Sequence, residues 1–255
     1  MYDFKFGGES LSKHFARVTS RPPVEVAEYD FTMQELDGKS GADFIDNKRY
    51  KNVEFEREVG FFNSPARNVY NYPQELIQWL AYKKGYQDFE DSDHPGMITQ
   101  AVLVNFPQVQ RELSRIYKAP IRFSRLPFWY LKSAYELSEV SKSAPTTFVN
   151  PYPIDSKPLI LLHFDISGTS PASASFKITT GGVTTTYSVS SVDLSVSGYV
   201  YFDCETQEVR QGTASVNYLD FPAPKGFEVG ESTFEIFSGS SALSDVWVAP
   251  RWRSL

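Results

Sequence analysis

The chain has 255 residues, a hydrophobic content of 41% and a formal net charge of −6 at pH 7. This length accommodates one large domain or two of ordinary size, and the apolar content is sufficient for packed cores. The acidic balance argues against a protein that binds nucleic acid by neutralising phosphates, and against one that binds membranes through a basic surface. Because Cys204 is its one cysteine, the chain has no intrachain disulfide, which fits folding in a reducing compartment.

No targeting or membrane-spanning segment is predicted. The start, MYDFKFGG, lacks the basic stretch and apolar run of a signal peptide. The longest apolar runs, near 101–104 and 159–162, are too short to cross a bilayer. We therefore expect a soluble protein made in the cytoplasm.

The N-terminal region alternates between predicted strands and turns. Residues 2–6 alternate aromatic and polar side chains and stop at Gly7-Gly8, a hairpin-like turn. Behind the extended Arg21-Pro22-Pro23 segment, residues 24–33 are a second predicted strand. Turn-forming residues then begin a predicted loop over 37–51.

The clearest predicted strand covers 53–61. Its apolar positions, with Arg57 among them, share one face, and Glu54, Glu56 and Glu58 share the other. This pattern is typical of an antiparallel sheet with one buried and one wet face. A row of carboxylates resembles acid–base machinery, but a solvated strand face is the better interpretation.

One helix is predicted, over 72–84. Asn71 is its expected N-cap, Pro73 lies in its first turn, and Gly85 ends it. The spacing of its apolar side chains predicts a buried stripe. The stripe consists of Leu76, Ile77, Trp79 and Leu80.

The segments after the helix predict a loop and further strands. The acidic stretch 88–94 resembles a loose metal-binding run, but it lacks the ligand spacing and the glycine of an EF-hand loop, so a surface loop is favoured. Residues 97–106 are a predicted strand, whereas 109–117 fit a short helix or a strand equally well. A strand from Ile121 leads into the closing stretch of this half, Arg125–Leu131.

The closing stretch carries three consecutive aromatic residues. Strand alternation places Phe128 and Tyr130 on one face and Trp129 on the other, which predicts a strand buried on both faces. After Tyr135 the composition becomes rich in serine and threonine and poor in basic residues. We therefore predict an N-terminal domain over 1–136 and a C-terminal domain over 137–255, with 138–153 as a polar linker.

The C-terminal domain is predicted to be a β-sandwich. Short apolar alternations recur there between glycine-rich turns, without a helical period. These alternations cover 159–166, 174–180, 183–189, 199–204, 214–219, 234–237 and 246–248.

No catalytic constellation is predicted. The three histidines lie far apart in unrelated contexts, and the chain has no metal-, phosphate- or dinucleotide-binding motif. Cys204 lies in an alternating segment, where a cysteine is most often a small core residue. We therefore predict a protein that is not an enzyme and holds no metal or cofactor. A hydrolase whose carboxylates converge only in the fold stays open as an alternative.

A carbohydrate-binding module is the main alternative function, because exposed aromatic rings on a β-sandwich stack on sugars. Trp252, which Arg251 and Arg253 flank, is one candidate for such a contact, although closure of the final strand is the favoured interpretation. The candidate aromatic residues of the second domain are Tyr187, Tyr201, Tyr218, Trp247 and Trp252.

Several short motifs, in order along the whole chain, resemble the distal tail protein (Dit) family, the baseplate hub of siphophages that infect Gram-positive bacteria. The turns at 150–153 and 230–232 depart from the family pattern. The matching motifs are Phe4–Ser10, Arg21-Pro22-Pro23, Asp37-Gly38, Tyr50–Phe55, the helix that ends in Trp79-Leu80, Pro127–Tyr130, Tyr201–Cys204 and Arg251-Trp252-Arg253.

The resemblance implies a mainly β protein of two parts. The first is a ring-forming, tail-tube-like β-sandwich with one α-helix, and the second is a galectin-like β-sandwich. Six copies would form a ring at the virion tail tip, made in the host cytoplasm, through which DNA passes. The ring would join the tail-tube protein to the tail-tip protein, and its outer domains would carry a receptor-binding protein.

We expect contacts with a neighbouring subunit or partner in the loops over 37–51 and 88–95, although a solvated loop explains either segment equally well. The residues singled out for such contacts are Asp43, Lys48, Arg49, Asp88, Asp91 and Trp252.

Overall fold

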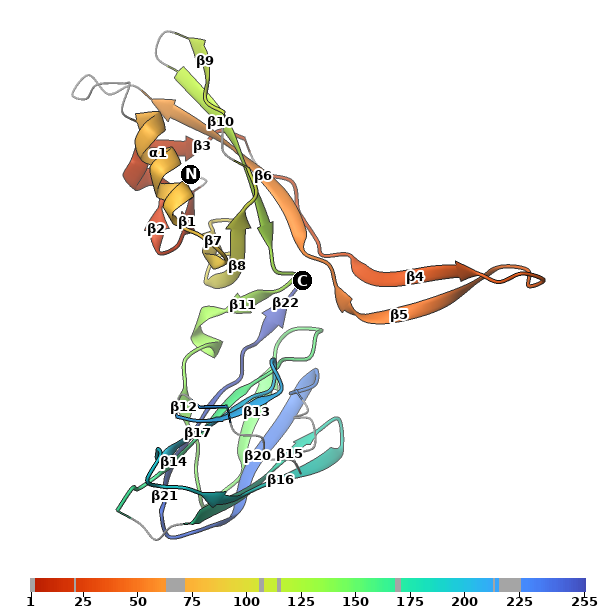
Figure 1. The fold of residues 1–255 in the computed structure, drawn as a ribbon, viewed down its shortest axis with the longest axis vertical. Coiled ribbons are helices and arrows are strands. Elements are labelled where there is room, and N and C mark those ends of the chain that lie inside the picture. The colour runs from red at the N-terminus through yellow and green to blue at the C-terminus, as the bar shows by residue number, and fades with distance from the viewer. Residues whose placement is uncertain are drawn as a thin grey trace. The chain divides into compact units, whose positions relative to one another are not determined.

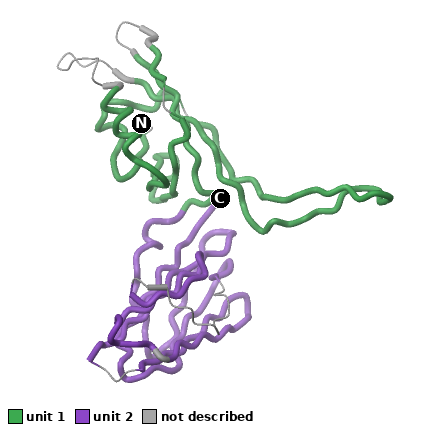
Figure 2. The backbone as a smooth tube through the Cα atoms, viewed as in Figure 1, with its two compact units in different colours: residues 1–129, 255 green, residues 130–254 purple. Residues whose placement is uncertain are grey.

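The computed structural model is mainly β (Figure 1). Its chain divides into two compact units, which comprise 1–129 with Leu255 and 130–254 (Figure 2). This division falls at Trp129/Tyr130, whereas the sequence placed the domain boundary between Glu136 and Leu137. The structure describes residues 3–20, 22–62, 72–105, 108–113, 116–167, 171–212, 214–215 and 226–255.

The first unit is built on an antiparallel sheet with strand order β2-β1-β7-β8-β10-β6-β3, and β9 pairs with β10. The predicted strand at 53–61 is confirmed as β6, which pairs along its whole length with β10. The elements are β1 (Phe4–Phe6), β2 (Glu9–Ser10), the 3-10 helix η1 (Leu11–His14), β3 (Ala16–Val18), β6 (Val53–Phe62), β7 (Gln87–Asp91), β8 (Met97–Leu103), β9 (Gln110–Leu113) and β10 (Ile116–Arg125).

The helix α1 (Tyr72–Tyr82) packs on the aromatic core of this unit. Leu76 and Leu80 are buried, and the Trp79 ring lies 6.3 Å from the Phe4 ring. The helix stops at Tyr82, two residues before its predicted end, and the expected cap Asn71 lies outside the described residues.

Two strands of the first unit form a separate hairpin, β4 (Tyr29–Glu35) and β5 (Ala42–Tyr50). Figure 1 draws them in orange, paired with each other. The sequence predicted a strand over 24–33 and a loop over 37–51. The loop prediction is wrong for 42–50, because each of these residues except Asn47 and Lys48 pairs with β4. Residues 22–28 have no regular secondary structure, so the predicted strand over 24–33 is observed only from Tyr29 onward.

Other predicted loops also contain strands. Residues 88–91 of the acidic stretch belong to β7, so only 92–95 form a loop there. The segment predicted as a linker, 138–153, contains β12 (Ser138–Glu139) and β13 (Thr146–Asn150). The open choice at 109–117 resolves as strand, in β9 and the start of β10.

The second unit consists of two sheets around one hydrophobic core. One sheet has the order β12-β21-β14-β17-β18-β19 and the other β13-β20-β15-β16. The Cys204 side chain is buried in this core, as predicted. The strands are β14 (Leu159–Phe164), β15 (Ala172–Thr180), β16 (Val183–Val192), β17 (Tyr199–Asp203), β18 (Glu208–Gln211), β19 (Ala214–Ser215), β20 (Gly230–Gly239) and β21 (Leu243–Ala249).

The closing stretch ends in β11 (Trp129–Leu131), which leads into the 3-10 helix η2 (Lys132–Ala134). Trp129 is buried in the core of the first unit. Tyr130 is buried in the second unit, where its hydroxyl donates to Glu205 Oε1 at 2.5 Å. The prediction that both faces of this strand are buried is confirmed for these two residues. Leu131 N donates to Trp252 O, next to the last strand β22 (Arg253–Ser254).

Candidate assembly surface

One face of the β4–β5 hairpin presents large apolar side chains to solvent. Phe31 is 48% exposed, Met33 58% and Phe44 59%. Met33 lies directly opposite Phe44, and the Phe31 ring lies 5.2 Å from the Phe44 ring. At the base, the Tyr29 and Tyr50 rings make a second contact at 5.1 Å. We call these five side chains the hairpin face.

The opposite side of the hairpin is mostly polar. Asp30 lies opposite Arg49, whose Nε donates to Asp30 Oδ2 at 2.6 Å and contributes to lowering the Asp30 pKa. Thr32 lies opposite Ile45 and accepts a hydrogen bond from Asn47. The hairpin is therefore amphipathic: both of its sides carry exposed residues, although Asp30 at the base is only 9% exposed.

The hairpin brings together three of the predicted contact residues on β5. Asp43 makes an ion pair with Lys39 in the turn, and Arg49 pairs with Asp30 across the strands. Lys48 lies at the irregularity of β5 with a φ of 54°, and its side chain is exposed. Their charges flank the hairpin face rather than forming a site of their own.

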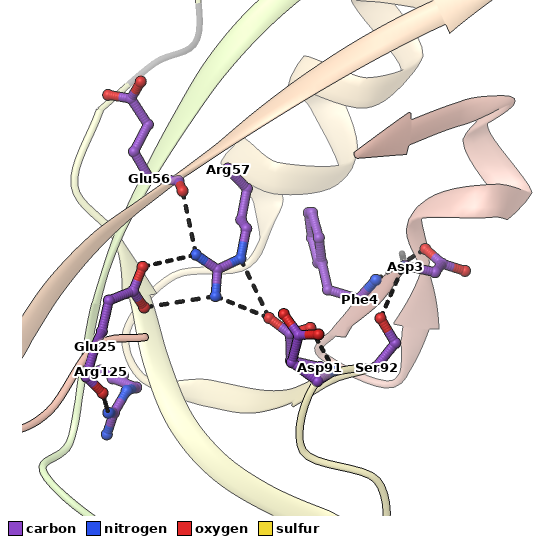
Figure 3. A network of polar contacts seen from close by, with 9 residues as sticks. Asp3, Phe4, Glu25, Glu56, Arg57, Asp91, Ser92 and Arg125 are labelled. Atoms are coloured by element: carbon purple, nitrogen blue, oxygen red, sulfur yellow. Dashed lines mark hydrogen bonds and ion pairs between the residues drawn. The ribbon is translucent and has the colours of Figure 1, made fainter. Parts of the chain in front are cut away.

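A buried ionic cluster holds the segment that leads into β4. Arg57 is 4% exposed, and its guanidinium lies between the carboxylates of Glu25 and Asp91 (Figure 3). Arg57 Nη1 is 2.8 Å from Glu25 Oε1, and Nη2 is 2.9 Å from Asp91 Oδ2. The cluster therefore ties the segment before the hairpin, through Glu25, to strands β6 and β7.

A second buried arginine fixes the same segment through backbone atoms. Arg125 Nη2 donates to Glu25 O at 2.9 Å, while Nη1 donates to Leu126 O and Pro127 O. Its guanidinium lies 5.2 Å from the centre of the Trp129 ring. Burial lowers the pKa of Arg125 to about 10, so the group stays charged at neutral pH.

The remaining predicted contact residues lie elsewhere. Asp88 is exposed on β7. Asp91 is 7% exposed and paired with Arg57, so its prediction as a contact residue is corrected to an internal role. Trp252 is 8% exposed in the core of the second unit, 5.8 Å from the Phe227 ring, which supports the alternative that it closes the final strand.

The glutamate row on β6 lies on a solvated strand face, as the sequence pattern predicts. Glu54 and Glu56 are exposed, Arg122 Nε donates to Glu56 at 2.8 Å, and Lys118 pairs with Glu58 at 3.3 Å. In the part of the chain that the structure describes, no cluster of three or more His, Cys, Asp or Glu side chains is placed to hold a metal ion. None of the described helices has the length and apolarity needed to cross a membrane.

Sequence reasoning missed the hairpin face and the Arg57 cluster. The signal for the face was partly present, since Tyr29, Phe31 and Met33 alternate with polar residues within a predicted strand. Its other half, 42–50, is polar and follows the turn-forming residues at 37–41, which favours the predicted loop. Nothing local links Arg57 to Glu25 and Asp91, which lie 32 and 34 residues away.

Comparison with known proteins gives matches by structure alone. No protein-family model matches the sequence, and no curated protein sequence matches it. The fold matches the Dit protein of phage SPP1, described as a paradigm of the hub adsorption apparatus in phages that infect Gram-positive bacteria. The TM-score is 0.65 at 12% identity, over 97% of each chain.

A chain of the phage p2 baseplate, in its activated conformation with Sr, matches with a TM-score of 0.52 at 10% identity, over 100% of this chain and 98% of that one. Both matches cover the two units together. The resemblance predicted from the sequence is thus confirmed at the level of the fold: this chain has the fold of a Dit hub protein over nearly its whole length.

Proposed function

We propose that the chain is a structural phage tail protein, a baseplate hub that forms a hexameric ring at the virion tail tip. The observation that carries the proposal is the exposed hairpin face, in a chain that has a Dit fold over nearly its whole length. The ring joins the tail tube to the tail-tip and adsorption apparatus and lets DNA pass through its centre.

Leaving the apolar face of the hairpin uncovered costs stability. A two-stranded hairpin is marginally stable in water unless its apolar face packs on something else. Phe31, Met33 and Phe44 are each about half exposed or more, and burying them stabilises an assembly in proportion to the apolar area removed from water. A neighbouring copy that covers this face makes a heterologous contact, which closes into a ring when the rotation between copies allows it.

A hub between the tail tube and the tail tip contacts three kinds of protein. They are a tail-tube protein on one side, a tail-tip protein on the other and a receptor-binding protein at the periphery. DNA is passing cargo, and the net charge of −6 disfavours its retention. The protein is made in the host cytoplasm and acts by self-assembly and docking rather than as an enzyme.

The test is the solution mass of the purified protein across a range of concentrations, measured by light scattering and native mass spectrometry. The proposal expects a species of six times the 28.9 kDa chain mass, alone or after addition of the tail-tube protein. A protein that stays monomeric under both conditions would overturn it.

A further inference from the structure

His94 lies in the loop after β7, and its imidazole stacks on the indole of Trp129. The two ring centres are 4.2 Å apart, with an angle of 11° between the planes. Trp129 is 2% exposed, so the imidazole packs on the core of the first unit. The His94 side chain is half-buried and also lines a pocket of about 250 Å³ formed by β1, β7 and this loop, so protons reach it from solvent.

A second proton on this imidazole leaves a donor at Nδ1 without an acceptor. Nδ1 is buried, and in the described part of the chain it has no hydrogen-bond partner. A protonated imidazole carries an N–H group on each nitrogen. A buried N–H without an acceptor destabilises the folded state, so the geometry around His94 favours the neutral ring.

His163 in the second unit shows an arrangement that does accommodate a second proton. Its ring also stacks on an aromatic side chain, that of Tyr199, at 4.5 Å. Its Nδ1 lies 3.1 Å from Asp245 Oδ2, so the protonated ring donates to a carboxylate there. The two histidines therefore differ in the partner of Nδ1 and not in the stacking.

Most of the charges that act on His94 belong to the buried ionic cluster. Arg125 and Arg57 repel a cation at this position, whereas Asp91 and Asp93 attract one. Asp91 already pairs with Arg57 at 2.9 Å. A protonated His94 therefore competes with Arg57 for Asp91 and repels both arginines.

The other elements around His94 leave this balance unchanged. Strands β8 and β11 carry no charged side chain. At the pocket, Lys5 pairs with Glu90 at 3.3 Å, and Asp3 accepts a hydrogen bond from Ser10 at 2.6 Å. Burial of the ring outweighs the attraction of the carboxylates, and it lowers the pKa of His94 below its ordinary value of 6.5.

Both arginines that a protonated His94 repels hold Glu25, whose position is shown in Figure 3. Arg57 pairs with the Glu25 carboxylate, and Arg125 Nη2 donates to the Glu25 carbonyl oxygen at 2.9 Å. The Arg125 guanidinium also lies 5.2 Å from the centre of the Trp129 ring on which His94 stacks. A proton on His94 thus acts on the contacts that fix residues 22–28, which we call the leading segment of the hairpin.

We propose that His94 is a proton-sensitive control on this anchor, and that protonation of its ring releases the leading segment from Arg57 and Arg125. Because the folded state disfavours the protonated ring, the anchor holds above pH 6.5 and weakens as the pH falls below that value. In a hub, the release loosens the hairpin whose exposed face a neighbouring copy covers. Only this last consequence rests on the function proposed above.

The test is hydrogen–deuterium exchange of the leading segment, measured by mass spectrometry from pH 7.5 to pH 5 and corrected for the intrinsic exchange rate at each pH. This range lies above the ordinary pKa of carboxylates, about 4. The corrected exchange of the parent protein is expected to rise about fivefold or more as the pH falls. His94→Phe keeps a flat ring against Trp129 but takes up no proton, so its corrected exchange should stay at the level of the parent at pH 7.5.

His14→Phe is the matched control within the same unit. The His14 ring stacks on Trp79 at 4.3 Å, and burial lowers its pKa too. The charges that act on it lie on β2, η1 and α1, away from the arginine anchor. This variant should therefore show the same rise as the parent. His94→Gln, which also lacks a titrating group, replaces His94→Phe if the latter does not fold.

Two results would overturn the inference. One is a parent whose corrected exchange in the leading segment is the same at both ends of the pH range. The other is a rise that the folded His94 variant shares with the parent. The solution mass is measured at the same pH values. A protein that forms the ring while the leading segment does not respond to pH contradicts this inference alone, and a monomer whose leading segment responds contradicts the hub alone.

Discussion

Arg57 occupies an inward position on β6 between apolar neighbours, where a charged side chain is tolerated only with partners. Glu25 and Asp91 provide them, at 2.8 and 2.9 Å. Removing the guanidinium therefore leaves Asp91, which is 7% exposed, as a buried charge.

We expect Arg57→Met to lower the free energy of unfolding by about 3–5 kcal/mol. Urea denaturation of the purified variant measures this. Arg122→Met is the matched control on the next strand, since Arg122 pairs with Glu56 at 2.8 Å but both side chains are exposed. Its loss should stay within about 1 kcal/mol. Equal losses in the two variants would show that the buried cluster has no special role.

Cys204 gives a second test at a single side chain. Burial, together with the neighbouring charge of Asp203, raises the pKa of its thiol to about 12. The reactive thiolate is therefore scarce at pH 8, and the side chain is only 1% exposed. Iodoacetamide should alkylate the folded protein far more slowly than the urea-unfolded protein, as followed by mass spectrometry. Similar rates in both states would contradict the buried position.

Among the elements, the β4–β5 hairpin allows a direct test of whether its exposed rings form an intersubunit contact or are simply solvated. Phe44 and Ile45 are neighbours on β5 that point to opposite faces, and they are 59% and 43% exposed. If the hairpin face is an intersubunit contact, Phe44→Ser should reduce the assembled fraction at least tenfold, while Ile45→Ser should leave it unchanged. Light scattering over a dilution series measures both variants.

Neither substitution should change the free energy of unfolding of the monomer by more than about 1 kcal/mol, because both side chains are exposed. This control distinguishes a loss of assembly from a loss of folding. If the two variants assemble equally well, the hairpin face is not the contact.

A strand can be predicted from the sequence when one of its faces is buried, because apolar and polar residues then alternate along it. Strand β6 has one buried and one wet face, so its alternation of Val53, Phe55 and Val59 with glutamates is visible locally. Strand β5 has no buried face within the chain, so its sequence lacks this alternation, and its many charged residues give it the composition of a loop. The burial of Asp91 was invisible for another reason, since it depends on a partner 34 residues away.

For the molecule as a whole, the hydrophobic residues form two separate clusters, one in each compact unit. The first contains Trp79 and Trp129, and the second contains Trp252. No buried member of one cluster belongs to the other among the described residues. Each unit therefore has a core of its own, which is the usual basis for independent cooperative unfolding.

We expect two transitions in calorimetric unfolding of the protein. Leu162→Ala, in the core of the second unit, should cost about 2–5 kcal/mol and lower the Tm of one transition only. Leu76→Ala should lower the other, because Leu76 is equally buried in the core of the first unit. A single transition that both variants shift together would contradict two independent cores.

The central claim is that the chain is a hub that closes into a ring, and negative-stain electron microscopy tests it most directly. The protein is imaged at high concentration, both alone and with the tail-tube protein. The account predicts class averages of a closed ring with sixfold symmetry and a central channel, in at least one of the two samples. Particles the size of a single 28.9 kDa chain in both samples would contradict it.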